Sequence, residues 1–352
     1  MGTYGKNAGG ETVFVGIDLH QRTWHVTVRT VDRELFTTGI RGEWDALERV
    51  LRKIDSDDIR VVYEAGYFGF WLQHRLTALG VDCIVTPPSL IPQEYGNRVK
   101  TDRKDSRKLA HLLAKDLLKQ VYVPSEEELY HRQVLRRRTQ LIRDRVRTQN
   151  RIKAELRFYG LDIPSPRGKW TKIYVNNLKR IRFGNRWIQE SFNRLIEMYE
   201  FLSGQIQEQT HLLLELAKDN RYQERVEILT SIPGIGVLTA MELLLELINM
   251  ERFSKPEQLA AYVGLTPAQY SSGDKVRMGR ITGIGKSHLR ATMVEASWYL
   301  ITRDDAMRKI YDRIKSRAGG KRAIVGVTRR LLLITRKMLN DGQTYRQAIP
   351  AA

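Results

Sequence analysis

The sequence predicts an α/β domain, then a basic helical arm, then a mainly helical domain, and three observations lead to this prediction. Residues 12–87 hold five strand-like runs, some alternating apolar with polar residues and others apolar throughout. Two long segments follow in which apolar residues recur at helical spacing. The chain after about residue 223 is typical of helices joined by glycine-rich turns. We therefore expect domains at 1–120, 121–222 and 223–352, since 352 residues suffice for two or three separate cores.

The first domain is predicted from the order of its elements. Strands are expected at TVFVGID, TWHVTVR, ELFTTGI, IRVVYEA and VDCIVTP, and helices around EWDALERVLRKI and FGFWLQHRLTALG. A short HQR turn makes the first two strands an antiparallel hairpin, whereas the helices allow parallel crossovers. The order β-β-β-α-β-α-β followed by a helix is that of a ribonuclease H-like (RuvC-like) domain.

The arm is predicted from two long helical patterns. Between residues 126 and 159 the apolar positions that set the helical spacing are Leu129, Val134, Leu135, Ile142, Val146, Ile152 and Leu156. Gly160 and Pro164 end this helix, and a second one is expected from about Trp187 to Leu216. Two long helices with a basic connector form an antiparallel hairpin or coiled-coil arm most simply, and such an arm serves dimerisation equally well.

Charge is distributed in blocks along the chain. The net charge is +19, and 25 Lys and Arg stand against 9 Asp and Glu between residues 98 and 187. Such a block indicates binding to a phosphate backbone, although solvated helix faces are an alternative, and charge does not distinguish RNA from DNA. The cations that we expect on nucleic acid in the arm are Arg136, Arg137, Arg138, Arg143 and Arg147.

The cysteine and histidine content and the hydropathy argue against disulfide-linked, zinc-binding and membrane-spanning proteins. The single cysteine, Cys83, excludes an internal disulfide and a cysteine zinc cluster and favours the reducing cytoplasm. The seven histidines show no metal-binding spacing, so we interpret them as structural or surface residues. No run is long and apolar enough to span a membrane. We expect a soluble cytoplasmic protein without a membrane partner.

Four acids are the candidate catalytic residues. Asp18 ends the first predicted strand, Glu64 ends the fourth, and Asp102 and Asp105 lie three residues apart on a predicted helix. Each acid taken alone is better explained as a cap of a turn or as a favourable charge at a helix N-terminus. In the predicted sheet, however, all four converge, and converging carboxylates bind Mg²⁺ or Mn²⁺ in phosphodiester chemistry. Cations that flank the acids and suit backbone phosphates are Lys100, Arg103, Lys104, Arg107 and Lys108.

Two glycine-rich elements stand out in the third domain. The PGIG turn with Gly234 and Gly236 resembles a helix-hairpin-helix, whose backbone N–H groups bind DNA phosphates, although a plain helical corner is as good an interpretation. The second element is an Arg-rich loop that contains Ser271 and Ser272. A serine in such a loop is most often an ordinary loop serine. A serine nucleophile would need neighbouring cations, and Lys275, Arg277 and Arg280 are present here.

Four ordered blocks resemble one family over nearly the whole chain. They are GIDLHQRTWHV, YEAGYFGFWLQHRLTALG, KTDRKDSRKLAHLL and SIPGIG through LAAYVGLTPAQYSSG to GRITGIGKSHLR. The chain resembles the DEDD transposases of bacterial insertion sequences, which are bridge-RNA-guided recombinases. The N-terminal extension MGTYGKNAGGET departs from the pattern and has no function that we can assign.

The resemblance implies an architecture and a set of roles. It implies a RuvC-like nuclease domain, a coiled-coil arm and a C-terminal domain with a catalytic serine. Asp18, Glu64, Asp102 and Asp105 would then bind metal, and Ser272, with Ser271 in reserve, would form a covalent phosphoserine link to DNA. The expected partners are donor and target DNA duplexes, a structured guide RNA and further copies of the chain, as a dimer or, in the active complex, a tetramer. The expected location is the bacterial cytoplasm at the nucleoid.

Three rival hypotheses follow from the same residues. A RuvC-like structure-specific endonuclease would hydrolyse branched DNA with the four acids and no covalent step. A requirement for Ser272 therefore distinguishes the transposase from this endonuclease. A catalytically silent nucleic-acid scaffold would need neither acids nor metal. A tyrosine recombinase with Tyr270 as nucleophile would leave the four acids unexplained.

Overall fold

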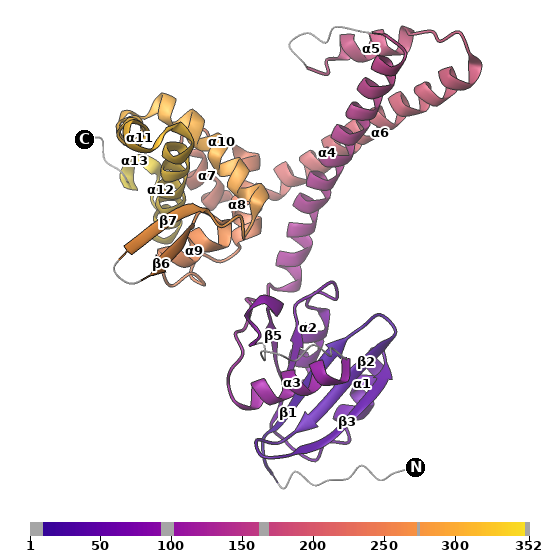
Figure 1. The fold of residues 1–352 in the computed structure, drawn as a ribbon, viewed down its shortest axis with the longest axis vertical. Coiled ribbons are helices and arrows are strands. Elements are labelled where there is room, and N and C mark those ends of the chain that lie inside the picture. The colour runs from indigo at the N-terminus through magenta and orange to yellow at the C-terminus, as the bar shows by residue number, and fades with distance from the viewer. Residues whose placement is uncertain (1–9, 93–101, 162–168, 273–274, 349–352) are drawn as a thin grey trace. The chain divides into compact units, whose positions relative to one another are not determined.

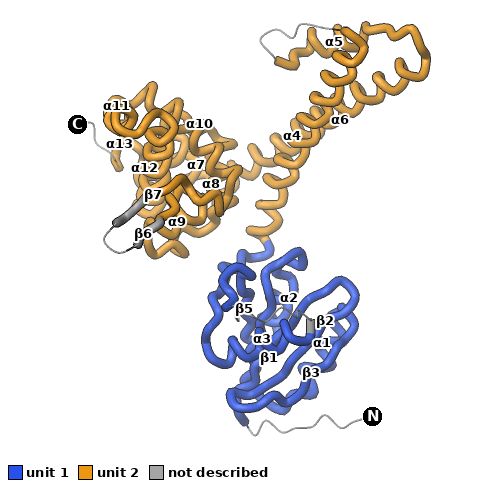
Figure 2. Tube along the Cα trace, viewed as in Figure 1, with its two compact units in different colours: residues 1–126 blue, residues 127–352 orange. Residues whose placement is uncertain are grey.

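The computed structural model describes residues 10–92, 102–161, 169–272 and 275–348, without the side chains of residue 102 and of residues 270–278. The chain divides into two compact units, residues 1–126 and 127–352 (Figure 2). Each unit has hydrophobic clusters of its own and is described separately.

The first unit is built on a five-stranded sheet (Figure 1). Its strands are β1 (Val13–Leu19), β2 (Thr23–Arg29), β3 (Glu34–Arg41), β4 (Ile59–Glu64) and β5 (Asp82–Thr86), in the spatial order β3-β2-β1-β4-β5. The pairs β1–β2 and β2–β3 are antiparallel, whereas β1–β4 and β4–β5 are parallel. The predicted element order is confirmed, including the hairpin and the two crossovers.

Helices cover both faces of this sheet. Helices α1 (Trp44–Leu51) and α2 (Trp71–Ala78) pack on one face, where alternate residues of β1, Val13, Val15 and Ile17, are fully buried. Helix α3 (Asp102–Ala114) packs on the other face, where Leu109 and Leu112 form a smaller cluster with Val62. The alternation read from the sequence therefore corresponds to two covered faces.

The contact between α3 and β1 depends on Gly16. A Cβ atom at this position would overlap the carbonyl oxygen of Ser106 and the amide nitrogen of Ala110. The helix backbone thus lies directly against the strand, and Ser106 Oγ lies 2.9 Å from Thr27 Oγ1 on the adjacent β2. Only glycine permits this approach without a shift of the helix.

The second unit begins with the predicted pair of long helices, α4 (Glu126–Phe158) and α6 (Arg186–Leu216). They are antiparallel, because Arg138 of α4 hydrogen bonds Thr210 of α6, whereas further along α4 Ile152 clusters with Phe192. Helix α5 (Lys172–Arg180) was not predicted. It begins at the Thr171 cap and buries one face in the cluster at the tip of the arm.

The rest of the second unit is mainly helical, as predicted. Its helices are α7 (Gln223–Thr230), α8 (Val237–Leu247), α9 (Pro256–Val263), α10 (Ser287–Arg303), α11 (Asp305–Ala318), α12 (Gly320–Asp341) and α13 (Tyr345–Ala348). Strands β6 (Pro267–Ser272) and β7 (Lys275–Ile281) form a two-stranded antiparallel sheet where we expected only a glycine-rich loop. No helix within the described ranges is both long and apolar enough to cross a membrane.

The glycine contact gives a first prediction. Gly16→Ala should lower the free energy of unfolding of the first unit by about 1–3 kcal/mol, because the methyl group forces α3 away from β1. Gly39→Ala is the matched control, since a Cβ there meets His25 Nε2 at an ordinary 3.6 Å. Chemical denaturation followed by circular dichroism measures both changes. Equal stability of the two variants would contradict the proposed tight contact.

Candidate functional site

Asp18 and Glu64 lie side by side at the carboxyl ends of neighbouring strands. Strands β1 and β4 are parallel, and the register pairs Ile17 with Tyr63, so the next residues along each strand are Asp18 and Glu64. Side chains alternate between the two faces of a sheet. Both acids therefore belong to the face that carries Gly16 and Val62, which is the face covered by α3.

Helix α3 runs antiparallel to β1 and directs its first turn towards the same end of the sheet. Ser106 lies beside Gly16 and Thr27, whereas His111 Nδ1, further along the helix, lies 2.7 Å from Arg29, whose register partner is Phe14 near the start of β1. The residues that precede Ser106 thus run towards the end of β1. This first turn carries Asp105, which is half-buried, and the backbone of Asp102.

The side chain of Asp102 lies outside the described part of the structure. Among the side chains that are described, no three acidic, histidine or cysteine groups lie together as a metal-binding group. The arrangement of the backbone thus brings the four positions to one end of the sheet, and metal binding by them stays a prediction. Asp18 also hydrogen bonds His20, whose Nε2 lies 3.1 Å from Asp18 Oδ2, a contact that was not predicted.

The predicted cations of the first unit have different environments. Arg103 and Lys104 are exposed on the first turn of α3, beside the acids. Arg107 forms an ion pair of 2.8 Å with Glu34. Lys100 lies outside the described residues.

The predicted serine nucleophile lies at the end of β6. Ser272 is opposite Lys275 in the β6–β7 register, Ser271 is opposite Val276, and Tyr270 is opposite Arg277. The side chains of these residues lie outside the described part, whereas Arg280 is described and exposed. The hairpin thus places the backbone of Ser272 level with that of one of the three expected cations.

The PGIG turn joins α7 to α8 and combines two features. Gly234 has a φ of +95°, and a Cβ there would lie 2.9 Å from the carbonyl oxygen of Ala296 in α10, so tight packing explains this glycine. Gly236 caps α8, has open space around its Cα, and lines a hollow that Arg303 also lines. Phosphate binding at the start of α8 is compatible with this open side.

The five arginines predicted to bind nucleic acid in the arm do not all point to solvent. Arg137 and Arg143 are exposed, and Arg147 is an exposed partner of Asp144. Arg136 forms an ion pair with Glu246, and Arg138 Nε donates to Thr210 Oγ1 at 2.8 Å. Arg136 thus joins the arm to α8, and Arg138 joins the two helices of the arm to each other.

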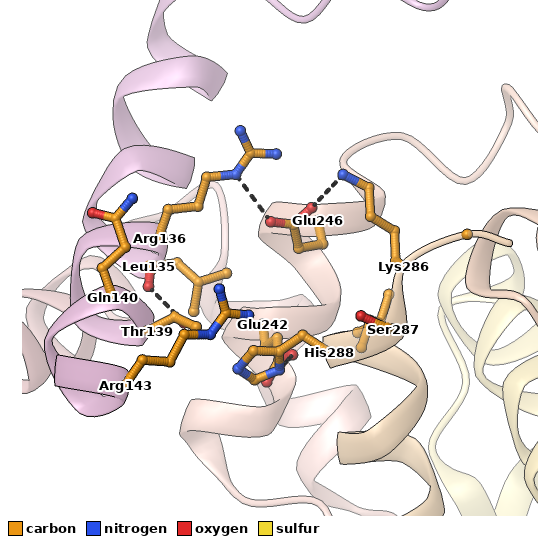
Figure 3. A pocket seen from close by; sticks show the side chains of 12 residues that line it. Leu135, Arg136, Thr139, Gln140, Arg143, Glu242, Glu246, Lys286, Ser287 and His288 are labelled. Atoms are coloured by element: carbon orange, nitrogen blue, oxygen red, sulfur yellow. Dashed lines mark hydrogen bonds and ion pairs between the residues drawn. The ribbon is translucent and has the colours of Figure 1, made fainter. Parts of the chain in front are cut away.

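A charged cluster lies at the root of the arm, where α4 packs against α8, and was not predicted from the sequence (Figure 3). Two carboxylates one turn apart on α8, Glu242 and Glu246, line a pocket of about 360 Å³ together with residues of α4 and the start of α10. Glu246 pairs with Arg136 at 3.3 Å and Lys286 at 3.4 Å. Glu242 accepts from Thr292 and pairs with His288 Nδ1 at 2.8 Å.

The two carboxylates differ in how strongly their charge is compensated. Burial raises the pKa of Glu242, and His288 and Thr292 oppose this effect only in part. Burial also acts on Glu246, but Lys286 and Arg136 outweigh it and hold the pKa of that carboxyl below its usual range. Arg132, buried in the same region, donates from Nε to the carbonyl oxygen of Leu245 at 2.9 Å. The cluster therefore fastens α4 to α8 by charge as well as by apolar packing.

This compensation predicts a pH-dependent stability. Glu246→Gln should lower the free energy of unfolding by about 1–3 kcal/mol at pH 7, because Arg136 and Lys286 lose their counter-charge. Since the pKa of Glu246 is lowered on folding, its contribution is complete above its ordinary pKa of 4.5 and disappears as the pH falls further. Thermal unfolding from pH 7 to pH 3.5 measures the effect.

Glu242→Gln provides the matched comparison. Its raised pKa means that its charged form is unfavourable in the folded state, so the variant should lose less stability at pH 7 than Glu246→Gln. A larger loss for Glu242→Gln, or a loss for Glu246→Gln that persists unchanged at pH 3.5, would contradict the assignment.

Two family models match different parts of the chain, and both describe transposases of the same group. A family model described as "Transposase IS116/IS110/IS902 family" matches residues 226–312, and a model of the DEDD transposases of IS110 elements matches residues 15–160. The second range contains all four candidate acids, and the first contains the serine hairpin.

Individual relatives are similar over different shares of the chain. The transposase for insertion sequence element IS1533 of Leptospira borgpetersenii is 29% identical over 256 residues, 71% of this chain and 73% of that protein. The transposase for IS1111A of Coxiella burnetii is 25% identical over 276 residues, 75% of this chain and 72% of that protein. The IS110 43.6 kDa protein of Streptomyces coelicolor is 34% identical over 127 residues, 35% of this chain and 31% of that protein. The chain is therefore a transposase, a DNA-cutting recombination enzyme, and belongs to the IS110/IS116 family.

Proposed function

We propose that this insertion-sequence transposase cuts and rejoins DNA with two chemical groups, a metal-binding quartet in the first unit and a serine nucleophile in the second. The quartet consists of Asp18, Glu64, Asp102 and Asp105, and the nucleophile is Ser272. The observation that carries the proposal is the register that sets Asp18 beside Glu64, under the helix whose first turn holds the other two acids.

The donor set fits a divalent cation. All four side chains offer carboxylate oxygens, which suit Mg²⁺ or Mn²⁺, and carboxylates brought together repel one another unless a cation lies between them. A bound metal would supply stabilisation of negative charge on the attacking and leaving oxygens of a phosphodiester. His20, hydrogen bonded to Asp18, would orient that carboxylate.

The chain's own residues define the covalent step. The Ser272 hydroxyl loses its proton and its oxygen attacks the phosphorus. A phosphoserine bond forms as the bond to the leaving DNA oxygen breaks, and that oxygen takes up a proton and departs as the hydroxyl of the strand end. In the second step a strand-end hydroxyl attacks the phosphoserine and restores the serine. Lys275, opposite Ser272 in the hairpin, and Arg280 are the cations suited to stabilise charge on the phosphate.

The finer architecture and the partners belong to the same proposal. The sheet order supports a ribonuclease H-like assignment of the first unit, and the antiparallel α4–α6 pair supports a coiled-coil arm. Exposed cations such as Arg137 and Arg143, within a strongly basic stretch of sequence, suit the backbones of duplex DNA and of a structured RNA. We propose that this RNA supplies the sequence specificity and that the working complex contains several copies of the chain, at least a dimer and in its active form a tetramer.

The quartet is tested by replacing each acid with its amide. Asp18→Asn, Glu64→Gln, Asp102→Asn and Asp105→Asn should each reduce strand cleavage by at least about a hundredfold, because each removes a charged ligand of the cation. Chelation of divalent metal should abolish cleavage by the unaltered protein. Cleavage of labelled DNA is measured on denaturing gels, and Asp116→Asn, further along the chain from α3, is the matched control. Full activity of Asp102→Asn would remove this residue from the quartet.

The serine is tested by looking for protein attached to DNA. Ser272→Ala should bind nucleic acid normally but form no covalent adduct, whereas Ser271→Ala, displaced by one position in the strand, should still form it. Denaturing electrophoresis and peptide mapping of the adduct give the readout. Acid-dependent cleavage with free ends and no adduct would favour the hydrolytic endonuclease instead. Recombination by Ser272→Ala at the normal rate would direct attention to Ser271 and then Tyr270.

A further inference from the structure

An aromatic ladder leads to the surface directly after the strand that carries Glu64. The loop between β4 and α2 has the sequence AGYFGF, and its Tyr67 is 75% exposed. Single exposed aromatic residues are common on protein surfaces. Tyr67 differs because a continuous series of rings supports it from the core of the unit.

The ladder begins at Trp24, which is 1% exposed. The ring of Phe68 stands edge-on to Trp24 with centroids 6.2 Å apart, and the ring of Tyr67 lies on Phe68 with centroids 4.4 Å apart and planes inclined by 33°. Trp71 packs on Trp24 from a further side, with centroids 6.0 Å apart. Such arrangements are favourable aromatic geometries. Tyr67 is therefore supported by Phe68 on one side, whereas most of its remaining surface is open to solvent.

The loop that carries Tyr67 is held at a second point. Tyr63, buried in β4, donates its hydroxyl to the carbonyl oxygen of Gly69 at 3.1 Å. Gly69 has a φ of +65°, a conformation that favours glycine at this turn. Before the pair, the Ala65 N–H donates to the carbonyl oxygen of Thr86 at 2.8 Å. The loop is thus held on both sides of the Tyr67–Phe68 pair, which reduces the entropy that the loop would lose when a ligand contacts the ring.

The ladder stands at the end of the sheet that holds the candidate acids. Trp24 is the register partner of Leu19, which follows Asp18, and it packs on the face covered by α1 and α2, so the ladder reaches this end of the sheet from the face opposite to the acids. Tyr67 is three residues after Glu64, and three residues of extended chain span at most about 10 Å. Bases in a duplex are spaced about 3.4 Å apart along the axis, so this span corresponds to about three base steps.

We propose that Tyr67 is a positioning residue that stacks on an unpaired base of the DNA strand being cut, within about three nucleotides of the phosphate held by the acids. The inference rests on the proposed function of those acids. A flat ring with an open surface contacts any base, so the contact would fix the strand without reading its sequence. It also implies that the base leaves the duplex stack at this point, at the cost of its stacking and pairing energy.

The experiment separates base stacking from catalysis by using the inactive Asp18→Asn protein. The full-length protein is bound to DNA that carries its insertion junction, together with the RNA, and 2-aminopurine replaces single bases at each of the three positions on either side of the scissile phosphate. With Tyr67 present, one position should show quenched fluorescence. Tyr67→Ala in the same background should raise the 2-aminopurine fluorescence at that position at least twofold. Tyr67→Phe should retain the quenching because it keeps the ring.

Binding and cleavage provide the second readout. In the active protein, Tyr67→Ala should weaken DNA binding or slow cleavage by about 5- to 150-fold, the range expected for loss of one stacked base. Leu79→Ala, which removes another exposed apolar side chain of the same unit, should change neither. Unaltered thermal unfolding shows that each variant keeps its fold.

Each outcome has a distinct meaning. No position with Tyr67-dependent fluorescence, or a Tyr67→Phe variant as defective as Tyr67→Ala, would overturn the stacking proposal. Tyr67-dependent quenching in a protein whose cleavage does not need Asp18 would leave the stacking intact and overturn the metal quartet.

Discussion

The close contact between α3 and β1 at Gly16 is the constraint on which the candidate site depends. Because the helix backbone lies against the strand, the register along the helix is fixed relative to the sheet, and the first turn of α3 reaches the end of β1. Asp105 and the backbone of Asp102 are thereby brought to the strand ends that carry Asp18 and Glu64. A larger residue at position 16 would separate the first turn of α3 from Asp18, which lies about 85 residues earlier in the sequence.

The sequence predicted most of this arrangement because the first unit follows simple periodicities. Alternation in β1 and β2 and short turns between them define the hairpin, and helices between β3, β4 and β5 allow the parallel pairs. Once β1 and β4 are parallel neighbours, their last residues meet, so Asp18 and Glu64 were identifiable as a pair. Gly16 was not, since nothing local to it shows that a helix from residues 102–114 packs there.

The features that sequence reasoning missed depend on contacts between distant segments. The run PAQYSSGDKVRMGRI carries few apolar residues, so β6 and β7 form by pairing with each other and gave no strand pattern. Glu242 and Glu246 lie in the apolar run VLTAMELLLEL, and their partners come from α4 and α10. The basic excess of the arm likewise predicted one role for five of its arginines, whereas Arg136 and Arg138 contact other parts of the protein and Arg137 is exposed.

The uninterrupted length of α4 has a mechanical consequence. A helix of 33 residues is about 50 Å long at 1.5 Å per residue, and its root is fastened to α8 by Arg132 and Arg136. A tilt of only about 5° at that root would displace the far end by about 3 Å, since displacement scales with the length of helix beyond the root. The arm thus converts small rotations at the ionic contacts around Glu246 into larger displacements at its tip.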